Sequence, residues 1–169
     1  MNIFYLDPNP EVAARYHCDK HVVKMILESA QLLCTAHREL DSEVPEELYK
    51  ATHKNHPCSI WVRESIENYN WLYKLFCYLC DEYTFRYNKI HTTDKKLRNA
   101  LIMPPSNIPK TTLTNPPKAM PDEYKCNDVV ASYRAYYNGD KKRFARWTNR
   151  EIPTWFNSNN CNKGNLQNG

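Results

Sequence analysis

Acidic, basic and cationic side chains recur on one side of a predicted helix that covers residues 11–38. With about 100° of turn per residue, one face of this helix carries, with Lys20 at its border, His17, His21, Lys24, Glu28, Gln31 and Thr35. An imidazole, an ammonium group and a carboxylate within one patch can transfer protons to and from a substrate. We therefore predict that the catalytic residues are His17, Lys20, His21, Lys24 and Glu28. The alternative is that the stripe is only the solvated face of an amphipathic helix.

The same helix offers two histidines one turn apart. His17 and His21 have the i, i+4 spacing of a two-histidine zinc site, and the third ligand would come from Cys18, His56 or His91. The residue after His17 is a cysteine, so the chain has no HExxH motif here. We predict that the protein binds no metal and no other cofactor, and keep a metal-dependent hydrolase or nuclease as an alternative.

A second helix is predicted to begin at His56-Pro57 and to continue to about residue 89, because proline is favoured in the first turn of a helix. At roughly 45 Å it would be the central helix of the fold. Glu82 and Arg86 are spaced to pair inside it. The N-terminus of a helix attracts anions through its free N–H groups and partial positive charge. We therefore predict four substrate-binding residues on this second helix. They are Asn55 and His56 at its N-terminus, and Asn68 and Trp71 on its apolar face.

The C-terminal third combines cations with aromatic rings. Between residues 125 and 150 the chain contains Lys125, Tyr133, Arg134, Tyr136, Tyr137, Lys141, Lys142, Arg143, Phe144, Arg146, Trp147 and Arg150. Cations can contact phosphates and rings can stack on bases, although such rings also pack in ordinary cores. We predict nucleic-acid contact here, with substrate-binding residues Lys125, Tyr133, Arg134 and Tyr137.

The elements that must position these residues are mostly helical. A short extended run is predicted at residues 3–6, a short helix at 46–51, and further helices at 122–138 and 140–148. Six of the eleven prolines lie in residues 101–121, which excludes a regular helix there and predicts an ordered, extended crossover rather than a flexible linker. The prediction is a mainly α, single-domain helical bundle over residues 1–156, with a long central helix, a Pro-rich crossover, and a disordered tail at 157–169.

Composition narrows the class of protein. Only three glycines are present, which argues against a Gly-rich phosphate loop. The net charge of +4 is compatible with nucleic acid but does not require it. The N-terminus does not resemble a signal peptide, and no apolar run approaches the roughly 18 residues of a membrane span. The seven cysteines show no disulfide framework. We expect a cytoplasmic protein of an infected host cell, with no membrane partner.

Three segments carry a resemblance to a family of bacteriophage proteins: residues 18–25 (CDKHVVKM), Asn55-His56-Pro57, and residues 120–124 (MPDEY). The order of parts also resembles the phage-type pyrimidine-dimer DNA glycosylases, which are small all-α glycosylase/lyase enzymes with an N-terminal amine as nucleophile. In that family the amine is exposed by removal of the initiator methionine. Asn2 is not a small residue, so Met1 is expected to be retained here.

The resemblance implies a viral DNA-acting enzyme, a DNA glycosylase and lyase for damaged or modified bases. An amine would attack C1′ of the sugar and form a Schiff base, and the candidates are the Met1 amine, Lys20 and Lys24. His21, near the place of the family's catalytic glutamate, or Glu28, about two turns further on, would move the protons. The base would be flipped out between the first two helices. The alternative from another class is a non-enzymatic module that binds nucleic acid or a host protein. The predicted partner is DNA, and the oligomeric state is left open.

Overall fold

The computed structural model describes residues 1–157, and the predicted tail at 157–169 lies outside it apart from its first residue. In this part of the chain the regular elements are α1 (Pro10–Tyr16), α2 (Asp19–Leu40), α3 (Pro57–Glu64), α4 (Ile66–Tyr87), α5 (Thr92–Leu97), η1 (Asp122–Tyr124) and α6 (Val129–Asn138). No strand occurs among the described residues, and the extended run predicted at residues 3–6 has no regular secondary structure. The predicted mainly α class is confirmed. No helix within residues 1–157 is long and apolar enough to cross a lipid bilayer.

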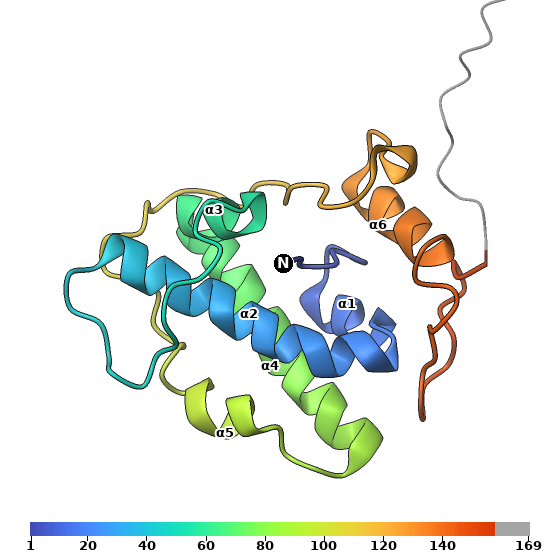
Figure 1. Cartoon of the computed structure of the whole chain (residues 1–169), viewed down its shortest axis with the longest axis horizontal. Helices are drawn as coiled ribbons and strands as arrows, with labels where there is room; N and C mark the ends of the chain where they lie inside the picture. The colour runs from blue at the N-terminus through green and yellow to red at the C-terminus, as the bar shows by residue number, and fades with distance from the viewer. Residues whose placement is uncertain (158–169) are drawn as a thin grey trace, which may run out of the picture.

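Helices α2 and α4 form the centre of the molecule, where they cross face to face (Figure 1). Their contact is made by fully buried apolar side chains, which on α2 include Met25, Ile26 and Leu33. The facing side of α4 contributes Leu72, Leu75 and Leu79, also fully buried. Removal of this apolar surface from water is the main force that holds the two helices together.

The predicted helix at 11–38 is in fact two helices, broken at His17 and Cys18. The break leaves backbone carbonyls without helical partners, and the buried guanidinium of Arg86 donates hydrogen bonds to them. Its Nη1 donates to the carbonyl of His17 (2.8 Å) and its Nη2 to that of Arg15 (3.0 Å). Glu82 and Asp19 complete the surroundings of Arg86 with ion pairs of 3.0 Å each. The internal pair of Glu82 and Arg86 expected from the sequence therefore also stabilises a change of chain direction.

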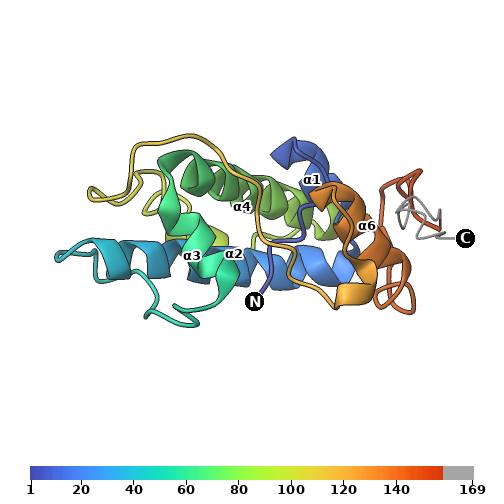
Figure 2. The ribbon, with the colours of Figure 1, turned by 90° about the horizontal axis from the view of Figure 1, so that it is seen from above.

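The predicted central helix at 56–89 is also broken, at Ser65, which leaves α4 as the longer piece. The Pro-rich crossover fills this break. The amide of Ile66 donates to the carbonyl of Pro109 (2.9 Å), and the Ser65 hydroxyl lies 2.8 Å from the carbonyl of Thr111. Asn68 binds both sides of Thr114, accepting from its amide and donating to its hydroxyl at 2.9 Å. The crossover is thus extended and ordered, and it runs from the α3–α4 junction past the N-terminus to α6 (Figure 2).

Two other predicted helices, at 46–51 and 140–148, are absent, and the one predicted at 122–138 begins later; in each case a side chain binds the backbone. Residues 46–51 form a turn at 46–47 and then irregular chain, in which the carbonyls of Leu48 and Tyr49 accept from Arg38. In the range 122–138 the chain begins a new helix after Asp128, whose side chain caps α6 through the amide of Ala131 (2.8 Å). Residues 140–148 form turns, because Asp19 of α2 binds the amide and hydroxyl of Thr148. Helix α5 was not predicted.

Candidate active site

The first six residues form an ordered arm inside the molecule. Ile3 and Leu6 are fully buried, and Asn2 is 9% exposed. The Asn2 amide nitrogen donates to the carbonyl of Ala119 in the crossover (2.7 Å), and its oxygen accepts from the amides of Ile3 (2.7 Å) and Phe4. Phe4 adopts φ 55°, a left-handed conformation that is costly for a bulky residue and must be offset by its surroundings. The arm therefore holds the terminal amine in one place.

The terminal amine of Met1 lies 3.6 Å from Oε1 of Glu28, a residue on the third turn of α2. The Met1 side chain is 2% exposed and that of Glu28 is 15% exposed. A primary amine beside a largely enclosed carboxylate is an arrangement in which a proton can pass from nitrogen to oxygen and leave a nucleophilic lone pair. The structure thus brings together two of the groups considered from the sequence, the Met1 amine and Glu28.

The N-terminus of α3 lies at the same place. His56 caps this helix, with its Nδ1 accepting from the amide of Cys58 (3.1 Å). Burial lowers the pKa of His56, the Met1 amine and His53 lower it further, and Glu28 opposes them. Burial raises the pKa of the Cys58 thiol to about 12, with smaller effects from the amine and Glu28, so the thiol stays protonated. His56 therefore shares its electrostatic surroundings with the amine and its carboxylate, whereas Asn55 is exposed.

The two histidines of the predicted stripe are buried in the core. His17 is fully buried, with Nδ1 2.7 Å from the carbonyl of Ala13. His21 stacks on Phe4 with ring centroids 4.2 Å apart, and its Nδ1 lies 2.6 Å from the hydroxyl of Tyr137. Burial lowers the pKa of His17 to about 4 and that of His21 to about 2, so both rings are neutral at neutral pH. Neither histidine is therefore a solvent-accessible group next to the Met1 amine.

The remaining members of the stripe divide between surface and core. Lys20 and Lys24 are exposed on the first turns of α2, Gln31 is partly buried and Thr35 is fully buried. The stripe is therefore not one continuous solvent-facing surface, because the arm and α6 cover its N-terminal part.

Most of the predicted substrate-binding residues hold the fold together. The Trp71 indole donates to the carbonyl of Pro8 (2.8 Å), and the Tyr133 hydroxyl donates to that of Pro117 (2.6 Å). Arg134 donates to the carbonyl of Leu6 (3.0 Å) and pairs with Asp7. Lys125 pairs with Asp122 at the surface. Trp71, Tyr133 and Arg134 therefore lie at contacts between segments, as do Asn68 and Tyr137. Among the predicted substrate-binding residues, His56 is the one that shares the surroundings of the amine.

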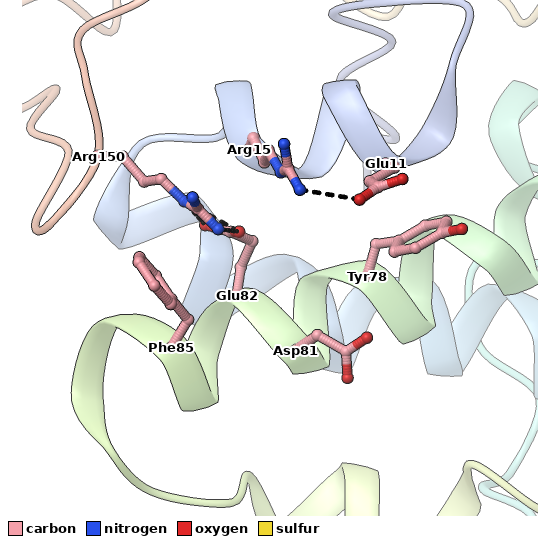
Figure 3. A pocket seen from close by; sticks show the side chains of 7 residues that line it. All are labelled: Glu11, Arg15, Tyr78, Asp81, Glu82, Phe85 and Arg150. Carbon is pink, nitrogen blue, oxygen red and sulfur yellow. Dashed lines mark hydrogen bonds and ion pairs between the residues drawn. The ribbon is translucent and has the colours of Figure 1, made fainter.

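A pocket of about 260 Å³ lies between α1, α4 and the C-terminal segment, away from Met1, and its lining residues are Glu11, Arg15, Tyr78, Asp81, Glu82, Phe85 and Arg150 (Figure 3). Its charges are already neutralised. Arg15 pairs with Glu11 (2.8 Å), Arg150 with Glu82, and Asp81 with Arg98. A ligand would find no unpaired charge there, so we do not assign the active site to this pocket.

The two histidines of the stripe do not form part of a metal-binding arrangement. Within residues 1–157 no three side chains of the His, Cys, Asp or Glu type come together in a way that could hold a metal ion. His17 and His21 each direct one ring nitrogen at a protein oxygen instead.

Comparison with known proteins gives the class. Residues 1–95, which contain the arm, α2, Glu28 and His56, match the family model of the pyrimidine dimer DNA glycosylases. The match covers more than half of the chain, and the chain belongs to this family of DNA-acting enzymes. No curated protein and no solved structure matches the chain.

Proposed function

We propose that the protein is a DNA glycosylase with lyase activity, in which the Met1 amine is the nucleophile and Glu28 moves the protons. The observation that carries this proposal is the 3.6 Å distance between the amine and the Glu28 carboxylate. An ammonium group has no lone pair, so its proton must first leave, and Glu28 is the carboxylate within reach. The family supplies the substrate class, damaged pyrimidines in DNA.

The chemistry proceeds in two stages. The amine lone pair forms a bond to C1′ of the nucleotide while the bond from C1′ to the base breaks, and the base leaves with that electron pair and gains a proton. The attached nitrogen then loses one proton, and its lone pair breaks the C1′–O4′ bond of the sugar ring, with O4′ gaining a proton, to give a protonated imine between Met1 and C1′. Removal of a C2′ proton then expels the 3′ phosphate by breaking the C3′–O bond. Glu28 is the group proposed to accept and return these protons.

The nucleotide must leave the base stack to reach a buried amine. We place it between α2 and the N-terminus of α3, beside His56. The Nδ1 atom of His56 accepts the Cys58 amide, so the neutral ring carries its proton on Nε2 and can donate to an oxygen of the substrate. His17 and His21 have no direct role in this proposal, because burial keeps both neutral and within the core.

The first test is borohydride trapping. A chain whose first residue has been verified as Met1 by mass spectrometry is mixed with duplex DNA that contains a thymine dimer or an abasic site, and sodium borohydride is added. We expect a covalent adduct whose mass maps to the peptide that contains Met1.

Two controls separate the amine candidates. Lys20→Met and Lys24→Met remove the other amines of the predicted site, and with saturating DNA the adduct should still form on the peptide that contains Met1. Selective methylation of the terminal amine to its tertiary form should abolish it. An adduct on Lys20 or Lys24 would overturn the assignment of Met1, and no adduct on either DNA would overturn the lyase activity and favour a binding module.

A further inference from the structure

A second group of side chains, next to the proposed site, gathers cations without carboxylates. Lys20 of α2 lies with its Nζ 4.6 Å from the centre of the Phe144 ring. Lys141, after α6, lies with its Nζ 4.7 Å from the ring of Tyr136 and 5.9 Å from that of Phe144. Arg143 lies 5.7 Å from the Phe144 ring. We call these five residues, with Lys24 one turn along α2 from Lys20, the cation–aromatic cluster.

The four cations of this cluster form no ion pair with another residue that the structure describes. Among residues 1–157, none of the four makes an ion pair or a side-chain hydrogen bond, whereas Lys125 of the same C-terminal third pairs with Asp122. The neighbouring carboxylate of Asp140 accepts from Tyr124 (2.7 Å). Contact with a ring orients a cation while leaving its charge available. Within residues 1–157 the cluster is therefore a positive surface whose cations are not ion-paired.

Two lysines of the cluster lie on α2 together with Glu28, and Lys141 lies beside the arm that ends in Met1. The Nζ of Lys141 is 5.8 Å from the ring of Phe4, three residues after the amine. Along α2, eight residues separate Lys20 from Glu28, which is about 12 Å at a rise of 1.5 Å per residue. In duplex DNA each strand advances about 3.4 Å per nucleotide. That distance therefore spans about three to four nucleotides.

From this placement we propose that the cation–aromatic cluster binds the DNA backbone three to four nucleotides from the nucleotide held at Met1 and Glu28. The inference rests on the proposed function for its choice of DNA as the occupant. Lys24, midway along α2 between Lys20 and Glu28, would contact the phosphates between these two points. The cluster shares Tyr136, Lys141, Arg143 and Phe144 with the basic and aromatic segment predicted to contact nucleic acid. It leaves out Tyr133, Arg134 and Tyr137, whose side chains bind other parts of the fold.

The first experiment measures binding without chemistry. Fluorescence anisotropy with undamaged duplex DNA over a range of salt concentrations gives the slope of log K against log salt. This slope becomes shallower by about 0.9 for each phosphate that the protein no longer neutralises. The double variant Lys20→Gln/Lys141→Gln should therefore reduce the slope by about 2. The matched control Lys96→Gln replaces an exposed lysine outside the cluster whose Nζ also lies over a ring, that of Tyr49 (4.7 Å), and it should leave the slope unchanged. An unchanged slope in the double variant would overturn the proposal.

The second experiment locates the contact. Single neutral methylphosphonates are placed at each position on both sides of a target nucleotide, and binding is measured for each duplex. Binding to the wild-type protein should be weakened most at positions three to four nucleotides away, and the double variant should lose that sensitivity. If the sensitive position is elsewhere, or persists in the variant, the cluster is not the phosphate contact. Neither experiment depends on catalysis, so a failed trapping reaction with a positive result here would separate the two proposals.

Discussion

The side-chain amide of Asn2 donates a hydrogen bond of 2.7 Å to the backbone carbonyl of Ala119. Asn2 precedes the first helix, and Ala119 lies in the crossover just before the last helices, so α1 to α5 all lie between them in the sequence. The bond ties the arm to the crossover, and the crossover is itself held at Ser65 and Asn68. The position of the terminal amine therefore depends on a segment far away in the sequence.

Replacement of Asn2 by leucine should misplace the amine. The variant loses the bond to Ala119 and the bonds to the amides of Ile3 and Phe4, which would cost about 1 kcal/mol of stability for each net hydrogen bond. A displacement of about 1 Å at a reacting atom can lower a rate by 10²-fold. We expect kcat to fall by about 10- to 100-fold with KM little changed, and the exposed Asn115→Leu serves as the control. A normal kcat in a destabilised variant would contradict this role.

Replacement of Glu28 by glutamine keeps the shape of the side chain but removes the proton acceptor. Steady-state cleavage of lesion-containing DNA should slow by roughly 10²- to 10⁴-fold, the usual contribution of general acid–base catalysis. Binding of the same DNA should change less than threefold. Glu39→Gln, on the exposed last turn of α2, is the matched control and should be as active as the wild type. Activity of Glu28→Gln within threefold of the wild type would exclude Glu28 from the proton transfers.

The buried histidines predict a loss of stability in acid. Because the pKa of His17 is lowered to about 4 and that of His21 to about 2, the unfolded chain binds protons below pH 6.5 that the folded chain does not. The free energy of unfolding should therefore be unaffected by these groups above about pH 7. It should fall by about 2 kcal/mol for each histidine between pH 7 and pH 5. The comparison is of slopes: His21→Gln should have a shallower pH dependence in urea unfolding, and the exposed His53→Gln should not. Equal slopes would show that His21 is protonated in the folded state.

Arg86, at the break between α1 and α2, should contribute more to the free energy of unfolding than the partly exposed Arg150, which also pairs with Glu82. Arg86 is fully buried, and Arg86→Met leaves Glu82 and two backbone carbonyls without this partner, at a cost of about 3–5 kcal/mol. The Arg150 side chain is 26% exposed, and Arg150→Met leaves Glu82 paired, at a cost of about 1 kcal/mol or less. Urea unfolding of the two variants at pH 7 measures the difference. Similar losses would mean that the buried pair is not the main stabilising interaction.

Local sequence patterns were sufficient for the class of fold and for the helix starts that are encoded nearby. Asn9 before Pro10 and His56 before Pro57 both begin helices as their residue types predict. The breaks at His17 and Ser65 were not predictable in this way. Their freed backbone groups are bound by Arg86 and by the Pro-rich crossover, and neither partner is adjacent in sequence.

The candidate site divides in the same manner. Glu28 and His56 were identified by residue type, and the Met1 amine was one of three amines considered. The residue types alone did not favour Met1 over Lys20 and Lys24, and only the resemblance to a family with an N-terminal nucleophile pointed to the first residue. The proposed choice of Met1 depends on the path of the arm. Tyr133, Arg134 and Tyr137 were predicted to bind substrate from an aromatic and basic composition. In the folded chain, hydrogen bonds to Pro117, Leu6 and His21 occupy these three side chains.

The family match ends at residue 95, yet the anchors of the arm lie beyond it, at Ala119, Tyr133 and Arg134. On the proposed mechanism, a chain still emerging from the ribosome would carry its nucleophile and its carboxylate long before it could align them. Catalytic competence would then appear only after most of the polypeptide has been made and has closed over its own beginning. With such timing the amine would stay unaligned with its carboxylate throughout translation. Activity of the first residue would then require that the C-terminal part of the chain has been made and folded.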